Sequence, residues 1–160
     1  MARAIGELQR FFLSEAEIEA SREIMGLDTQ LIADGTYFIV ENDGALAGSG
    51  GWSRRATLFG GDHSAGRDAA LLDPSNDPAR VRAMYTAPEF ARRGVGRMIL
   101  ALCEDAARAE GFAGVELAAT LAGEPLYRAC GYAVMEHMLA ATPSGRHIPL
   151  LRMGKTLAGK

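Results

Sequence analysis

Two kinds of hydrophobic pattern alternate along this chain and divide it into strands and helices. Short runs rich in β-branched and aromatic residues, or with apolar and polar residues in alternation, predict strands, whereas apolar residues three and four positions apart predict helices. The predicted strands are residues 36–41, 45–53, 80–86, 114–119, 132–139 and 147–153. The predicted helices are residues 14–25, 28–33, 97–110 and 123–130. This order predicts an α/β domain of the α+β type, in which helices pack on a mixed sheet.

Turn and cap residues support these boundaries. Ser14 followed by Glu17 forms a capping box at the start of the first predicted helix. Residues 42–44 (Asn-Asp-Gly) predict one hairpin, and residues 142–145 (Thr-Pro-Ser-Gly) predict a second one that closes the chain. Residues 60–79 form a long loop, and loops of that length are often functional. Since no repeat or linker interrupts the pattern, residues 1–160 are predicted to form a single domain.

Composition and charge exclude several classes of function. The net charge of the 160 residues is −3 at pH 7, which argues against a nucleic-acid partner. The apolar runs are too short to cross a bilayer, and no signal-peptide pattern is visible at the start. Cys103 and Cys130 are predicted to be free thiols in a reducing compartment, which indicates a cytoplasmic protein. The three histidines lack ligand spacing, so no metal site is predicted.

Residues 91–97 (Ala-Arg-Arg-Gly-Val-Gly-Arg), between a predicted strand and a predicted helix, carry the first sign of a binding site. The two glycines allow a tight turn that presents successive backbone N–H groups. The start of the following helix adds unpaired N–H donors and the positive end of the helix dipole. Residues 80–97 contain five arginines and one acidic residue, so their local charge of +4 opposes the net charge of the chain. The segment therefore predicts an anion site suited to a phosphate.

Two common phosphate-binding motifs do not fit this segment. The Walker pattern G-x-x-x-x-G-K-[ST] is absent, and the dinucleotide fingerprint G-x-G-x-x-G fails because Ile99 stands where the third glycine is required. A nucleotide-binding domain of another kind stays open as an alternative.

A second motif follows the glycine loop in a defined order. A strand ending in Thr86-x-Pro88 leads into Arg93-Gly94-Val95-Gly96 and a helix, and residues 126–132 (Leu-Tyr-Arg-Ala-Cys-Gly-Tyr) come after the next strand. In this order and spacing, residues 80–132 resemble the GNAT family of N-acetyltransferases. The resemblance implies a mixed, mostly antiparallel sheet with helices on both faces.

The resemblance also implies that acetyl-CoA is the acetyl donor. Its pyrophosphate would lie on the backbone N–H groups of residues 92–97, and its pantetheine arm would lie against the main chain of residues 84–86 like an added strand. One of these amides would polarise the thioester carbonyl. The implied cofactor-binding residues are Met84, Tyr85, Thr86, Arg92, Arg93, Gly94, Val95, Gly96, Arg97 and Thr120.

Tyr127 matches the family tyrosine that acts as general acid and protonates the departing CoA thiolate. The ordinary pKa of a tyrosine, near 10, is close enough to that of a thiol for this transfer. A buried structural tyrosine is the alternative. The chain departs from the family pattern at Ala91, where Gln or Arg is usual, at Thr120, where Asn is frequent, and at residues 1–10, which predict no first strand. A sheet that lacks this strand has a free edge, where two copies could pair as a homodimer.

The acceptor side is predicted from weaker features. Trp52 and His63 are predicted to line the acceptor pocket, with core packing as an equal alternative for Trp52. The candidates for a general base are Glu41, His63, Asp68 and His147. The acidic net charge favours a cationic amine, and the long loop favours a small molecule over a peptide. The sequence thus predicts an N-acetyltransferase that acts on a small primary amine by direct attack in a ternary complex.

Two other functions stay open beside this prediction. The domain could bind acyl-CoA without catalysis, as a sensor or an interaction module, or it could acetylate a protein or peptide.

Overall fold

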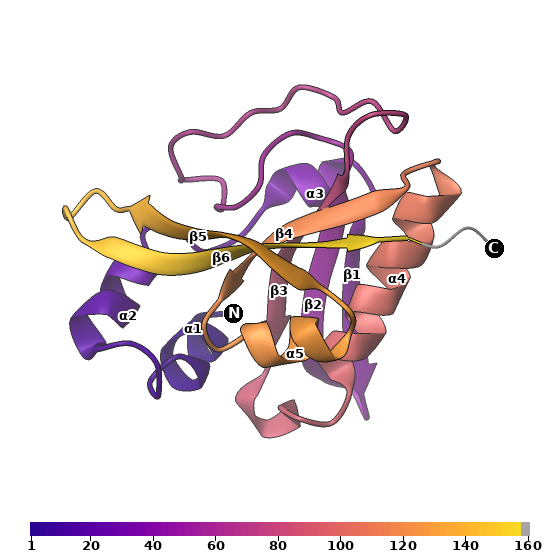
Figure 1. Cartoon of the computed structure of the whole chain (residues 1–160). Helices are drawn as coiled ribbons and strands as arrows, with labels where there is room; N and C mark the ends of the chain where they lie inside the picture. The colour runs from indigo at the N-terminus through magenta and orange to yellow at the C-terminus, as the bar shows by residue number, and fades with distance from the viewer. Residues whose placement is uncertain (158–160) are drawn as a thin grey trace.

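A six-stranded sheet runs through the computed structural model, in which residues 1–157 are described (Figure 1). Its strands are β1 (Tyr37–Asn42), β2 (Ala45–Ser53), β3 (Ala79–Thr86), β4 (Gly114–Thr120), β5 (Ala133–Ala141) and β6 (His147–Thr156). They are arranged in the order β1-β2-β3-β4-β6-β5. The β3–β4 pair is parallel and the other pairs are antiparallel, so the predicted mixed, mostly antiparallel sheet is confirmed.

Helices cover both faces of this sheet, as predicted (Figure 1). They are α1 (Ala2–Leu8), α2 (Glu15–Ser21), α3 (Thr29–Ala33), the short 3-10 helix η1 (Pro88–Phe90), α4 (Val95–Ala109) and α5 (Glu124–Ala129). One core joins the sheet to α4 and α5, and a second one joins its opposite face to α2 and the turns around it. Within residues 1–157, no helix has the length and apolarity needed to span a membrane.

Local sequence signals account for most element boundaries. The capping box of α2 is present, because the Glu17 N–H donates to Ser14 Oγ (3.2 Å) while the Ser14 N–H donates to the Glu17 carboxylate (2.8 Å). The helix ends at Ser21, earlier than the predicted residue 25, and α4 begins at Val95, two residues before its predicted start. Residues 1–10 form no strand but contain α1, which the sequence analysis did not predict and which buries Ala4 and Ile5.

Glycines in β2 allow α4 to pack close to the sheet. A Cβ on Gly48 would lie 2.6 Å from Val95 Cγ1 and 2.9 Å from the Tyr85 carbonyl oxygen, distances that real side chains do not adopt. The α4 side chains that fill the remaining space include Ile99, which is fully buried. The glycine-rich sequence of β2 thus holds the start of α4 against the ends of β2 and β3.

The strands β3 and β4 pair only briefly and then separate. Their parallel pairing covers Ala79 with Val115 and Arg80 with Glu116. On the other side of β3, three residue steps in β3 face two in β2, and the extra residue is a bulge where Ala83 has φ +53°. The bulge bends β3 away from β4, so the fold leaves an open cleft between the C-terminal parts of these strands.

Candidate active site

A cleft of about 760 Å³ opens where β3 and β4 separate. Its walls come from β3, the N-terminus of α4, α5, α1 with the turn after it, residues 24–26 and residues 58–60. The structure brings ten of the predicted cofactor and catalytic residues to this one cleft. They are Met84, Tyr85, Thr86, Arg92, Gly94, Val95, Gly96, Arg97, Thr120 and Tyr127.

The N-terminus of α4 has the geometry of an anion site at one end of the cleft. Arg92 (φ +61°) and Gly94 (φ +84°) adopt left-handed backbone conformations that turn the chain sharply into the helix. The first helical bond runs from the Met98 N–H to the Gly94 carbonyl (3.0 Å), and no side chain caps the donors that precede it. The N–H groups of residues 95–97 are therefore available to a ligand, with the positive end of the helix dipole behind them.

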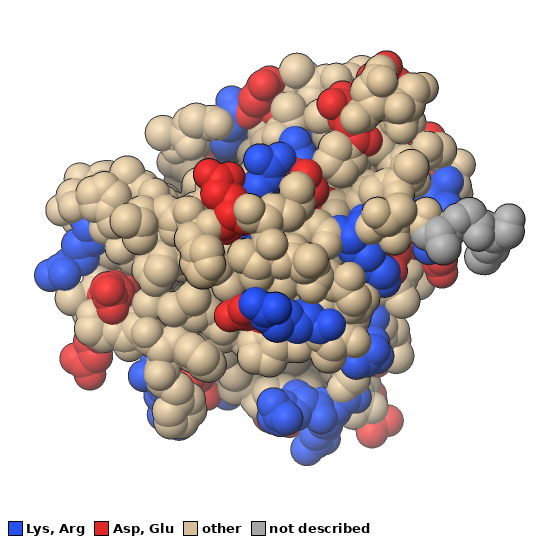
Figure 2. All heavy atoms as spheres, in the orientation of Figure 1, with Lys and Arg blue, Asp and Glu red and all other residues tan. Residues whose placement is uncertain are grey.

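Positive side chains surround this end of the cleft. Arg92 and Arg97 line it. Figure 2 shows Lys and Arg side chains gathered at the lower edge of the molecule, where the segment before α4 lies in Figure 1. Arg93, which was predicted to bind the cofactor, does not line the cleft, because its guanidinium group lies over the Phe90 ring, 5.7 Å from the ring centre.

The second glycine of the loop is explained by the close approach of α5. A Cβ on Gly96 would lie 2.7 Å from Leu126 Cδ2, so a side chain there would force α5 or its leucine to move. Gly96 thus keeps the start of α4 and the helix that carries Tyr127 in contact across the cleft.

The edge of β3 that faces the cleft lacks a strand partner beyond Arg80. Its backbone N–H and C=O groups can therefore pair with an extended ligand, which is how an added strand binds to a sheet edge. The side chain of Tyr85 has a different role, because its hydroxyl accepts a hydrogen bond from the Gly26 N–H (3.1 Å). Burial raises the pKa of Tyr85 to about 12, so this phenol stays protonated.

Tyr127 lies on α5 with only 7% of its surface exposed. Its ring contacts that of Tyr132 edge to face, with centroids 5.8 Å apart. Burial raises its pKa well above the ordinary value for tyrosine, so its hydroxyl keeps its proton at neutral pH. The turn before α5 is closed by the Gly123 N–H, which donates to Thr120 Oγ1 (3.1 Å). Thr120 therefore lines the cleft and also shapes the helix that presents Tyr127.

The two residues predicted to line the acceptor pocket lie elsewhere. Trp52 is 2% exposed in the core on the α4 face of the sheet, where its ring contacts Phe112. His63 lies on the 54–78 loop with Nε2 3.2 Å from the Arg22 carbonyl oxygen, outside the cleft wall. The other candidate bases, Glu41, Asp68 and His147, do not line the cleft either.

The structure adds residues that the sequence analysis did not select. Ile5 and Leu8 of α1 line the cleft, followed by Phe12, and their spacing of three and four residues is a helical signal. Arg82 of β3 also lines the cleft, although its side chain is only 1% exposed. Arg82 could have been selected from the sequence, because a charged residue within a strand predicted to be half-buried is unusual. Among the described residues, no set of three or more His, Cys, Asp or Glu side chains is grouped as a metal site.

Comparisons with known proteins agree with this architecture. The acetyltransferase (GNAT) family model matches residues 3–132. The fold is similar to that of a GCN5-related N-acetyltransferase from Rhodopseudomonas palustris, with a TM-score of 0.70 and 18% identity, over 98% of this chain and 84% of the other. The comparison with curated proteins finds no match.

Two further solved structures were determined with a ligand. The YncA protein of Salmonella typhimurium, solved with its cofactor acetyl-CoA, has a TM-score of 0.58 and 21% identity, over 91% of this chain and 72% of that one. The PaiA N-acetyltransferase of Thermoplasma acidophilum, in complex with coenzyme A, has a TM-score of 0.60 and 15% identity, over 97% and 87% of the two chains.

Proposed function

The chain belongs to the acetyltransferase (GNAT) family and is an acetyl-CoA-dependent N-acetyltransferase; on this premise we propose that its acceptor is the primary amine of a small molecule. The amine attacks directly in a ternary complex, and Tyr127 is the general acid. The observation that carries this proposal is the cleft itself, in which an anion site and a buried tyrosine meet across the separation of β3 and β4.

The residues of the cleft fit acetyl-CoA, which supplies the acetyl group as an activated thioester. The uncapped N–H groups of residues 95–97 would hold the pyrophosphate, and Arg92 and Arg97 would add positive charge. The free edge of β3 at residues 84–86 would pair with the pantetheine arm through the main chain. Together these groups would direct the thioester toward the bulge at Ala83, midway along the cleft wall.

Tyr127 is suited to donate a proton to the departing thiolate. It lines the cleft on α5, next to the start of α4. Burial raises its pKa, so the hydroxyl is present in its protonated form throughout the neutral range, and it is a weaker acid than an ordinary tyrosine with a pKa near 10. No hydrogen bond to another part of residues 1–157 occupies this hydroxyl, so its proton is free for a ligand.

The walls on the acceptor side support a small acceptor. Residues 58–60 of the long loop, residues 24–26 and the turn after α1 all line the cleft. These segments give the acceptor side walls of its own, and such walls suit a compact acceptor better than an extended peptide, which would need an open groove. Acetylation of a peptide or protein is therefore only the second candidate function.

The free cysteines Cys103 and Cys130 support our proposal of a cytoplasmic location.

The exposed Ile39 and Leu46 lie on the β1–β2 hairpin, and β1 is an edge of the sheet. These exposed apolar residues support our proposal that two copies pair along β1 as a homodimer. A measurement of the molar mass in solution tests this pairing.

The pH dependence of turnover tests this proposal. Within residues 1–157, no Asp, Glu or His lines the cleft, so the acceptor amine gives up its proton to water. We expect kcat/KM for a small primary amine to rise with pH and to follow the pKa of that amine. Since the pKa of Tyr127 is raised, no descending limb is expected below about pH 10. Release of CoA thiol, measured with two amines of different pKa, gives both profiles.

Two results would contradict the proposal. A rising limb near pH 6–7 that is the same for both amines would reveal a protein base. Turnover with peptide N-termini and none with small amines would assign the chain to the second candidate.

A further inference from the structure

The acceptor side of the cleft is lined by one charged residue. Its other side chains are mostly apolar, and those most relevant here are Phe11, Phe12, Met25 and Phe59. In the part of the chain that the structure describes, no carboxylate lines the cleft, so the second ammonium group of a polyamine would find no partner there. The residues that line this side therefore disfavour the cationic acceptor that the net charge favours. The one charged residue among them is Arg82.

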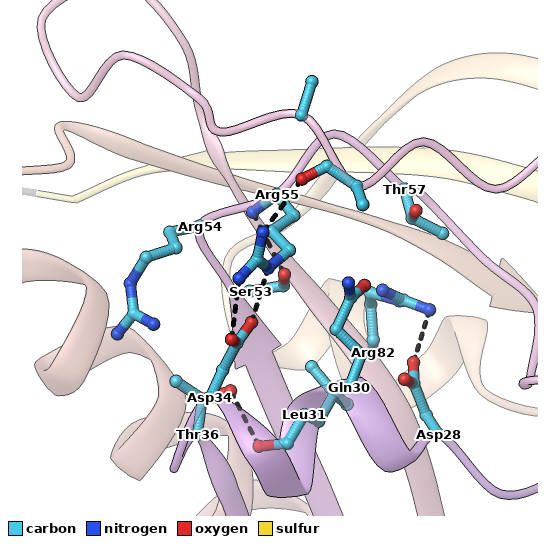
Figure 3. A network of polar contacts seen from close by, with 12 residues as sticks. Asp28, Gln30, Leu31, Asp34, Thr36, Ser53, Arg54, Arg55, Thr57 and Arg82 are labelled. Carbon is cyan, nitrogen blue, oxygen red and sulfur yellow. Dashed lines mark hydrogen bonds and ion pairs between the residues drawn. The ribbon is translucent and has the colours of Figure 1, made fainter.

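Arg82 is buried with an incomplete set of partners. Its Nη2 donates to the Gly60 carbonyl oxygen (2.9 Å) and forms an ion pair with Asp28 (Figure 3). Its Nε and Nη1 are buried and have no hydrogen-bond partner among the described residues. Buried donors without partners are rare in folded proteins, and a guanidinium group offers a planar fork that matches a carboxylate.

The nearby carboxylate is shared between two arginines. Asp28 Oδ1 also contacts Arg67 Nη2 at 3.0 Å. Asp62 is the next acidic group, and its Oδ1 accepts a hydrogen bond from the Thr29 backbone N–H (2.9 Å). Burial lowers the pKa of Arg82 to about 10, which leaves it charged at neutral pH. A buried cation that shares its counter-ion favours a second anion at this site.

The position of Arg82 along β3 separates it from the phosphate end of the cleft. It lies four residues before Thr86, which corresponds to roughly 13 Å of extended strand. It also lies beyond the bulge at Ala83, on the side where β3 and β4 pair. An anion bound by Arg82 would thus belong to the acceptor and not to the pyrophosphate.

We propose that the acceptor is an apolar α-amino acid, whose carboxylate is bound by the unpartnered donors of Arg82 when the buried guanidinium group turns toward the cleft. This inference rests on the proposed function of the cleft. The amine of such a molecule would face the separation of β3 and β4. Its side chain would cover apolar surface at the mouth of the cleft, where Phe11 and Phe12 are 81% and 48% exposed.

A matched pair of acceptors tests this assignment. Phenylalanine and phenethylamine share the aromatic body and the amine, and only phenylalanine carries the carboxylate. We expect kcat/KM for phenylalanine to exceed that for phenethylamine by at least about tenfold, and spermidine to be the poorest acceptor. Arg82→Gln should lower this ratio by at least about tenfold through the KM of phenylalanine, and Arg82→Lys should restore part of it.

A control variant separates recognition from support of the fold. Arg55 lies on the 54–78 loop, forms an ion pair with Asp34 (Figure 3), and does not line the cleft. Arg55→Gln should leave the ratio of the two acceptors unchanged. If Arg82 is only structural, Arg82→Gln will reduce turnover of both acceptors alike. That result, or a wild-type preference for phenethylamine or spermidine, would overturn the inference. If Arg82→Gln does not fold, the ranking of the three acceptors by the wild-type protein decides.

Thermal unfolding with acetyl-CoA in the same samples distinguishes failure of the amino-acid assignment from failure of the proposed function. Binding of acetyl-CoA, with turnover of another amine class, would overturn only the amino-acid assignment. Binding of acetyl-CoA without thiol release from any acceptor would overturn the proposed function and this inference with it.

Discussion

Replacement of Tyr127 by phenylalanine is expected to lower kcat by about 10²–10⁴-fold, the usual contribution of a general acid. The ring would still fill its place against Tyr132, so the packing of α5 would be kept. Only the hydroxyl would be lost, and with it the proton for the departing thiolate. Since the phenol does not help to hold the phosphates, the Kd of acetyl-CoA should change by less than about threefold. Thiol release and calorimetric titration measure the two quantities.

Tyr132→Phe is the matched control for this variant. Tyr132 is also buried, and its hydroxyl donates to Glu104 (3.1 Å), away from the cleft. Its kcat should stay within a few-fold of the wild-type value. Equal kcat values for wild-type protein and Tyr127→Phe would show that Tyr127 is a core residue. A non-catalytic acyl-CoA sensor, by contrast, would show no turnover in either protein and the same Kd.

Gly96→Val is expected to raise the Kd of acetyl-CoA by roughly 100-fold, or about 2.8 kcal/mol. The new side chain would collide with Leu126, so that this leucine or α5 as a whole would have to move away from the start of α4. It would also crowd the N–H groups that the phosphates need. The expected loss is comparable to that of one or two hydrogen bonds to a charged group. Calorimetric titration with acetyl-CoA and with CoA measures it.

Met98→Val controls for the cost of a β-branched residue in this helix. Met98 is 55% exposed and does not line the cleft. The Kd of acetyl-CoA for the Met98→Val variant should therefore match that for the wild-type protein. Adding Leu126→Ala to Gly96→Val should recover part of the affinity, because it removes the colliding atoms. A wild-type Kd for Gly96→Val would mean that acetyl-CoA does not use this end of the cleft.

The features that the sequence predicted correctly depend on local chemistry. The capping box of α2, the hairpin turn at residues 42–44 and the glycines before α4 act within a few residues, so their patterns determine the local backbone. The resemblance to a known family then placed Tyr127 and the glycine loop in one site, and the structure brings both to the same cleft.

The acceptor residues could not be predicted because they depend on tertiary structure. Alternation along β2 indicates which residues share a face, but not which face meets the cleft, and Trp52 lies on the α4 side. The position of His63 depends on how the 54–78 loop folds over the sheet. Arg82 was counted only as part of a basic segment, since its burial and its contact with Asp28 arise from elements 54 residues apart in the chain.

Net charge was a poor guide to the acceptor for a similar reason. The overall value of −3 sums groups over the whole surface. Within residues 1–157, the cleft is lined by arginines and by no carboxylate. A ligand in a partly closed site responds to those nearby groups more than to distant, screened ones.

Thermal unfolding of the wild-type protein with acetyl-CoA, CoA and ATP tests the central claim most directly. A ligand that binds only the native state at 100 times its Kd adds about 2.7 kcal/mol. For a domain of this size, that should raise the midpoint by roughly 5–10 °C. We expect this rise with acetyl-CoA and with CoA, and none with ATP. A folded protein whose midpoint does not move with acetyl-CoA or CoA would contradict the assignment of the cleft between β3 and β4 as an acetyl-CoA site.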